Sequence, residues 1–176
     1  RILNNNKKGL GGAINLGISF CSKEHVAIFM ADLSDNINDL IKYYKIMKNK
    51  KLDAVFGSRF IKKNSIKNYP KQKLIFNRIF NSFVRLVFLS KYNDFTNAFK
   101  IYKKSTLVKL KPFVSENFNI FLELPLKIIV RRKKYKIISI NWKNRKIGYS
   151  KFKVNELGSK YFFTLLYCFF EKILLR

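Results

Sequence analysis

Two carboxylates and a hydroxyl follow an apolar segment near the start of the chain. Residues 25–31 read HVAIFMA, and Asp32, Ser34 and Asp35 come directly after them. A short apolar run of this kind is typical of a buried strand, and ligands of open α/β sheets usually bind beyond the carboxyl ends of the strands. Hard cations such as Mg²⁺ prefer oxygen ligands. The pattern therefore predicts that Asp32, Ser34 and Asp35 form a cation site at the end of a strand.

Arginine side chains suited to phosphate binding occur at two further places. Residues 53–56 form a second short apolar segment that runs into Gly-Ser-Arg and so ends in Arg59. A guanidinium group matches phosphate geometry, although pairing with a nearby acid is the simpler interpretation of Arg59 alone. Arg78, Ser82 and Arg85 recur at i, i+4 and i+7, on one stripe of a helix. This stripe fits a solvated face or a phosphate-binding face at a membrane surface.

Two other segments carry groups that need an explanation. Residues 145–151 read RKIGYSK, in which Arg145 and Lys151 flank a glycine and a serine, a composition suited to a diphosphate or a lipid phosphate. Glu123 lies inside an apolar run, where a carboxylate requires a basic partner. A structural ion pair is the first interpretation of Glu123, and a role as a site carboxylate in catalysis or acceptor positioning is the second.

The elements that must position these groups alternate between strand and helix patterns. A Gly-rich segment at 6–12 favours a loop-to-helix joint over a phosphate loop, because the P-loop spacing is absent. Ile37, Leu40, Ile41, Tyr44 and Met47 predict one apolar helix face after the acids. No repeat divides the chain, so we expect a single α/β domain over 1–176. The other predicted elements are strands at 25–30, 53–56 and 135–142, a loop at 61–71, a helix at 72–89, and a turn with an aromatic strand at 92–102.

The composition narrows the class of protein. The 37 basic and 10 acidic residues give a net charge of +27, which favours polyanionic partners such as nucleic acid, anionic lipid or phosphorylated substrates. His25 is the only histidine, so this chain supplies no Ser-His or Cys-His triad through a second histidine. Cys21 and Cys168 fit no metal-ligand spacing or disulfide framework, which favours a reducing compartment.

The C-terminal segment is apolar but short. The run from Tyr161 to Phe170 is about half of what a membrane-spanning helix needs. It continues through Glu171 and Lys172 to Leu175, so the pattern is amphipathic. We expect a helix over 161–176 that packs on the core or lies in a membrane interface.

Taken in order, these segments resemble the inverting glycosyltransferases of family 2, most closely those that act on polyprenyl phosphates, the dolichol-phosphate mannosyltransferase type. The last segment matches the pattern R-x-x-G-x-S-K. The segments that carry the resemblance are NKKGLGGAINLG at 6–17, FMADLSD at 29–35, GSRF at 57–60, RIFNS at 78–82, DFTNAFKIY at 94–102, the region of Glu123, and RKIGYSK at 145–151.

The resemblance implies the nucleotide-sugar-binding GT-A fold and a divalent cation, Mg²⁺ or Mn²⁺. Asp32 matches the last carboxylate of the family's D-x-D motif, so the cation would rest on Asp32 with help from Ser34 or Asp35. The resemblance also implies catalytic roles for Asp32, Arg59 and Arg145. The positions that it assigns to the acceptor phosphate are Arg59, Arg78, Ser82, Arg145 and Lys151.

The implied function is transfer of a sugar from a nucleotide sugar to a dolichyl or undecaprenyl phosphate. Such an acceptor is already an anion, so no general base is needed. The partners would be the nucleotide sugar, the lipid acceptor and a membrane surface at its cytoplasmic face, with no nucleic acid. Two departures bear on these expectations. Met30 replaces the first acid of the D-x-D motif, and the family's first strands have no counterpart before Arg1, which predicts a partial GT-A domain.

Two alternatives to an active transferase follow. One is a catalytically degenerate relative of these enzymes. The other is a non-catalytic basic domain that binds nucleic acid or a membrane surface, which would need basic and aromatic residues on one exposed face.

Overall fold

A four-stranded mixed sheet lies at the centre of the protein. The computed structural model describes residues 2–6, 9–144 and 154–175, except the side chains of 154–157. Three strands run in the same direction, and the fourth, β4, runs against its two neighbours. The carboxyl ends of the three strands therefore meet at one edge, together with the start of β4. The strand order is β1 (His25–Ile28), β4 (Lys100–Lys103), β2 (Ala54–Ser58) and β5 (Tyr135–Ser139).

A second, two-stranded sheet extends this carboxyl edge. It pairs β3 (Ile66–Lys67) with β6 (Trp142–Lys143) in parallel, and Asp35 makes a bridge to Trp142. The segment expected as a loop at 61–71 therefore contains a strand. This pairing ties three segments that are far apart in sequence to the same end of the molecule.

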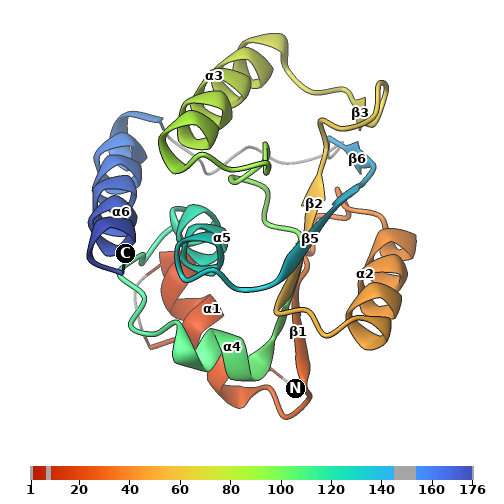
Figure 1. Ribbon diagram of the computed structural model, residues 1–176. Coiled ribbons are helices and arrows are strands. Elements are labelled where there is room, and N and C mark those ends of the chain that lie inside the picture. Colours follow the sequence, from red (N-terminus) through yellow and green to blue (C-terminus); the bar gives the residue numbers. More distant parts are fainter. Residues whose placement is uncertain (1, 7–8, 145–153, 176) are drawn as a thin grey trace.

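Helix α2 (Ile37–Asn49) covers one face of the sheet (Figure 1). It begins where the sequence predicts, because Asn36 Oδ1 accepts a hydrogen bond from the backbone N of Asn38. The predicted apolar face is only partly right. Tyr43 and Met47 are buried, whereas the predicted Ile37, Ile41 and Tyr44 are exposed. Tyr43 faces inward because its hydroxyl donates to the carbonyl of Phe99, which satisfies a buried polar atom.

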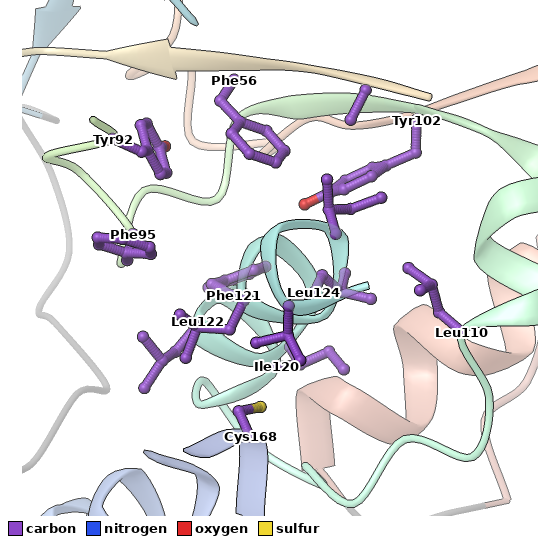
Figure 2. Close-up of a cluster of buried hydrophobic side chains, with 14 of the residues drawn as sticks. Phe56, Tyr92, Phe95, Tyr102, Leu110, Ile120, Phe121, Leu122, Leu124 and Cys168 are labelled. Atoms are coloured by element: carbon purple, nitrogen blue, oxygen red, sulfur yellow. The ribbon is translucent and has the colours of Figure 1, made fainter. Parts of the chain in front are cut away.

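Helices α1 (Gly9–Phe20), α4 (Lys104–Lys109) and α5 (Ile120–Val130) cover the other face. Figure 2 shows α5 between the sheet residues Phe56 and Tyr102 and the residue Cys168 of α6 (Val154–Leu174). Almost every side chain of α5 is buried, so this helix is the centre of the main core. Within the described residues, no helix combines the length and the apolar content needed to cross a bilayer.

A proline in α5 explains the surroundings of one buried lysine. Pro125 has no N–H to donate to the carbonyl of Phe121, four residues earlier. Lys100 Nζ lies 3.4 Å from that carbonyl and donates to it, and it also donates to the carbonyls of Phe95 and Asn97. A lysine side chain of the sheet thus supplies a donor in place of the N–H that Pro125 lacks.

Helix α3 (Lys71–Phe88) is attached to the segment that precedes β4. Asn81 Oδ1 accepts a 2.6 Å hydrogen bond from the backbone N of Phe95, and Asn77 Nδ2 donates to Thr96 Oγ1 at 2.8 Å. The aromatic strand expected at 92–102 is shorter in the structure. Only its last residues are strand, because residues 92–99 form the turn that α3 holds.

The Gly-rich segment is a packing joint. The backbone N of Gly11 donates to the carbonyl of Glu116 at 2.8 Å, and a Cβ on Gly11 would lie 2.1 Å from the carbonyl oxygen of Ser115. Glycine is required here because two backbones meet. Gly11 thus allows the start of α1 to pack against the backbone of residues 115–116. This role agrees with the loop-to-helix joint that the sequence favoured.

Candidate functional site

The acidic turn after β1 forms the first part of the candidate site. Asp32 Oδ1 accepts a hydrogen bond from the backbone N of Ser34 at 3.1 Å. Leu33 between them has a left-handed backbone with φ of 55° and an exposed side chain. This tight turn folds the chain so that Ser34 and Asp35 are buried beside the sheet while Asp32 keeps partial exposure.

Asp35 is a buried carboxylate of this turn with a shifted pKa. Its pKa is raised to about 6, mainly by burial and also by the charges of Asp32 and Asp94, while the charges of Arg59 and Lys100 lower it. Its Oδ1 atom is buried and makes no hydrogen bond to any described residue. A buried acceptor without a donor is costly unless a proton or a cation occupies it, so this oxygen suits a cation ligand.

Arg59 follows β2 and is held by Asp94, which precedes β4. The guanidinium donates to both carboxylate oxygens, from Nε at 2.9 Å and from Nη2 at 2.7 Å, and the backbone N of Arg59 donates as well. The two side chains are 7% and 0% exposed. Burial lowers the pKa of Arg59, but the charge and hydrogen bond of Asp94 outweigh burial and raise that pKa above its usual value.

Aromatic rings surround Arg59 and connect it to helix α3. Its guanidinium carbon lies 5.3 Å from the ring centroid of Phe60, 5.8 Å from that of Tyr69 and 5.7 Å from that of Trp142. The guanidinium carbon of Arg78 lies 4.3 Å from the same Phe60 ring. The two arginines therefore share one ring, and such contacts favour a cation over an aromatic face.

The predicted site residues thus gather in part. Asp32, Asp35, Arg59 and Arg78 are brought together through Asp94, Trp142 and Phe60. Ser82 is exposed on α3, one turn after Arg78. Arg145 and Lys151 lie outside the residues that the structure describes.

Glu123 has the first of the two roles that the sequence left open. Its carboxylate lies 3.3 Å from Lys127 Nζ, and both side chains are fully buried. Its two oxygens also accept hydrogen bonds from the backbone N atoms of Val114 and Ser115. The lysine partner and the two amides account for a carboxylate in this apolar helix.

Three residues of the site were not singled out by their sequence pattern. Asp94 pairs with Arg59, Trp142 contacts both Asp35 and Arg59, and Lys100 lies buried nearby with a pKa lowered to about 7 by burial, against the opposing charge of Asp94. The sequence contained one signal for Asp94. A buried arginine needs an acidic partner, and this chain offers only 10 acids as candidates. The placement of Trp142 depends on the β3–β6 pairing.

A family model identifies most of this region. The model described as Glycosyl transferase family 2 matches residues 1–110, which is more than half of the chain. The match includes β1, β2, the acidic turn, Arg59, α3 and β4. It ends before the core helix α5 and the strand that leads to Trp142.

Solved structures share the fold at low sequence identity. Glucosyl-3-phosphoglycerate synthase from Mycobacterium tuberculosis in complex with UDP matches 95% of this chain and 57% of its own, with a TM-score of 0.64 and 15% identity. The same protein with Mn²⁺, UDP and phosphoglyceric acid gives a TM-score of 0.66 at 14% identity, over 95% of this chain and 56% of its own. A further complex of it contains Mg²⁺ and UDP, with a TM-score of 0.65 at 15% identity, over 92% and 55%.

These matches establish the architecture. The chain has the α/β GT-A fold, with a mixed sheet, that the sequence predicts. It spans a little over half the length of the solved structures that it matches.

Proposed function

Because the chain belongs to glycosyltransferase family 2, we propose that it transfers a sugar from a nucleotide sugar to a polyprenyl phosphate in a membrane, with inversion at the anomeric carbon. One observation supports this proposal most directly. The carboxylates of Asp32 and Asp35 and the guanidinium groups of Arg59 and Arg78 gather at one edge of the sheet. Such a site offers opposite charges to the two phosphate-bearing reactants of this reaction.

On the donor side, Asp32, Ser34 and Asp35 would hold Mg²⁺ or Mn²⁺. The buried Oδ1 of Asp35 fits this role because it lacks a donor among the described residues. The described part of the chain contains no cluster of three His, Cys, Asp or Glu side chains that could hold a metal. A site with two carboxylates is still compatible with Mg²⁺, because Mg²⁺ is usually bound by one or two carboxylates together with water and substrate phosphates. The bound cation would supply charge neutralisation for the departing nucleoside diphosphate.

On the acceptor side, Arg78 and Ser82 present donors from α3. Among the described residues, Arg78 makes a long 3.5 Å contact to the carbonyl of Asn93 in addition to its place over Phe60, so its N–H groups suit an acceptor phosphate. Arg59 is more constrained, because its Nε and Nη2 atoms already donate hydrogen bonds to Asp94. We therefore propose that Arg59 supplies positive charge from beneath the site and that it positions the turn after β2.

The proposed reaction uses the acceptor phosphate oxygen as its nucleophile. This oxygen attacks the anomeric carbon from the face opposite the leaving diphosphate, and the bond to that diphosphate breaks. No side chain has to remove a proton, which agrees with a site without histidine among its described residues. The residues contribute by orienting the two reactants and by stabilising charge. Arg145 and Lys151 would add cations over the phosphates.

The polyprenyl acceptor and a place at the cytoplasmic face of a membrane are the finer parts of this proposal. One of the mycobacterial structures contains phosphoglyceric acid, a phosphate compound, beside UDP and Mn²⁺, so a phosphate-bearing acceptor is the shared feature. A specific observation favours a second candidate, a degenerate relative, because Met30 is a poor ligand for a hard cation.

The direct test is transfer of labelled sugar by the purified protein, with Mn²⁺ present, from a panel of nucleotide sugars. Polyprenyl phosphate in detergent and phosphoglyceric acid are offered as separate acceptors. Transfer to the lipid that falls at least tenfold in both Asp35→Asn and Arg78→Ala supports the proposal. Lys45→Ala is the control, since Lys45 is an exposed cation on α2 and not on α3. Unchanged transfer in Arg78→Ala would refute the acceptor assignment, and no transfer from any donor would favour the degenerate relative.

A further inference from the structure

Helix α3 carries a line of large apolar side chains on its outer surface. Ile75, Ile79, Phe83 and Leu86 are 58%, 62%, 52% and 72% exposed. Their spacing of four, four and three residues places them on one side of the helix. The inner side is formed by other residues, including Asn81 and Val84. The predicted apolar stripe of this helix therefore faces away from the core.

Helix α6 carries a second line of the same kind. Phe162, Leu166, Phe170 and Ile173 are 61%, 39%, 57% and 50% exposed, and they follow the same spacing. Exposed apolar residues that occur singly are ordinary on protein surfaces, but contiguous groups mark interaction sites. The two lines therefore indicate an interaction site only if they form one continuous surface.

The two lines lie on the same side of the α3–α6 pair. Phe80 contacts Tyr161 and Phe88 contacts Phe169, so the contacts advance in the same sense along both helices. At about 100° per residue, the α6 line lies about a quarter of a turn from these contacts and the α3 line about two fifths of a turn, in opposite rotational senses on the two helices. For two helices that run in the same sense, this arrangement directs both lines outward together. Figure 1 shows α3 and α6 next to each other on the outside of the molecule.

Basic residues border this surface, which we name the α3–α6 face and define by the eight exposed residues above. Residues 60–88 contain seven lysines and arginines and no acid. Arg78 and Arg85 lie beside the apolar line of α3, and Arg78 also contacts Phe60 of the candidate site. On its α3 side, the face therefore combines apolar side chains with a positive border.

We propose that the α3–α6 face lies on the surface of an anionic membrane leaflet, with its apolar side chains inserted among the lipids and its basic border at the head groups. Amphipathic surfaces with this distribution bind membrane interfaces by apolar burial and attraction to anionic lipid. A second copy of the chain fits less well, because it would bring two positive borders together. A single-stranded nucleic acid also fits less well, because five of the eight residues of the face are aliphatic and offer no ring for base stacking.

This orientation gives the proposed reaction its access to lipid. Arg78 borders both the face and the site, so a phosphate at head-group depth would lie next to the acceptor side. The link to the acceptor rests on the proposed function, whereas membrane binding itself does not. The two can therefore fail separately.

The test measures co-sedimentation of the whole protein with vesicles, without any donor sugar. The vesicles contain phosphatidylcholine alone or phosphatidylcholine with phosphatidylglycerol. The double variant Ile79→Glu, Phe83→Glu should reduce binding to the anionic vesicles at least tenfold, and so should Phe162→Glu, Phe170→Glu on α6. Ile41→Glu is the matched control, because Ile41 is 48% exposed but lies on α2. Circular dichroism verifies that each variant is folded.

Three results would overturn the inference: binding that persists in both double variants, a wild-type dimer that both variants dissociate, or binding to single-stranded nucleic acid but not to vesicles. A transfer assay separates the inference from the proposed function. Transfer to an acceptor embedded in vesicles should fall in the double variants, while transfer to a soluble short-chain acceptor phosphate should not. Vesicle binding without any transfer would refute the proposed function and support the inference.

Discussion

Replacing Asp94 by Asn should lower the free energy of unfolding by about 3–5 kcal/mol, the usual cost of removing one partner of a buried ion pair. Asn has the same shape, so the change removes charge without opening a cavity. Arg59 then retains a buried positive charge, since its side chain is only 7% exposed. Unlike a buried lysine, an arginine does not relieve this cost by losing its proton.

The hydrogen bonds explain why the effect is large. Asp94 accepts three of them from Arg59, at 2.7–2.9 Å, and hydrogen bonds that involve charged groups contribute about 1.5–3 kcal/mol each. The amide oxygen of an Asn preserves part of this set, but its NH₂ group faces donors of the guanidinium. The expected loss is a large fraction of the stability of a typical domain, about 5–15 kcal/mol.

The assay is urea unfolding followed by circular dichroism, with a matched exposed pair as the control. Lys103 and Glu24 lie 3.6 Å apart with side chains 42% and 65% exposed. Glu24→Gln should therefore change stability by less than about 1 kcal/mol. The double variant Arg59→Met, Asp94→Asn should recover part of the loss. If the free energy of unfolding of Asp94→Asn lies within about 1 kcal/mol of the wild-type value, Asp94 is not needed to compensate the buried charge of Arg59 and the reasoning is refuted.

Three further predictions concern the same end of the molecule. The pKa of Lys100 is about 7 in the folded protein and 10.5 in the unfolded chain, so the unfolded chain binds more protons between these values and stability should rise with pH there. Urea unfolding at several pH values should show this rise in wild type and lose it in Lys100→Met, whereas equal slopes would contradict it. Gly57→Ala should cost at least about 1–3 kcal/mol by overpacking, because its Cβ would lie 1.8 Å from the hydroxyl of Tyr43. Adding Tyr43→Phe should offset part of that cost in thermal unfolding, and strict additivity of the two changes would contradict the contact. Mn²⁺ at about ten times its dissociation constant should stabilise wild type by about 1.4 kcal/mol, and Asp35→Asn but not Glu24→Gln should abolish the shift in melting temperature. An unchanged shift in Asp35→Asn would remove Asp35 from the cation site.

The sequence located the parts of the site that follow a strand. An apolar run that ends in Asp32 and Asp35, and another that ends in Arg59, are local patterns, and the carboxyl ends of like-directed strands meet at one sheet edge. The fold class was predictable for the same reason. The roles of these residues in binding a cation or a phosphate remain predictions.

Helix faces were predicted less well than helix positions. The apolar periodicity of α3 is real, but Ile79 and Phe83 face outward and Asn81 faces inward. Asn81 is buried because its side chain bonds the turn before β4, including the backbone of Phe95. In α2, the hydroxyl of Tyr43 has the same effect. Periodicity measures where apolar residues are, whereas specific hydrogen bonds decided which side was buried.

The sequence by itself determined that this is a strongly basic α/β chain whose strands deliver acids and an arginine to their ends, because those features depend on neighbouring residues. Only the tertiary structure decided that Arg59 pairs with Asp94, that Trp142 contacts both Arg59 and Asp35, and that two apolar helix stripes face outward together. Each of these contacts joins segments tens of residues apart. Their partners are chosen by strand pairing and helix packing, which local sequence patterns do not specify.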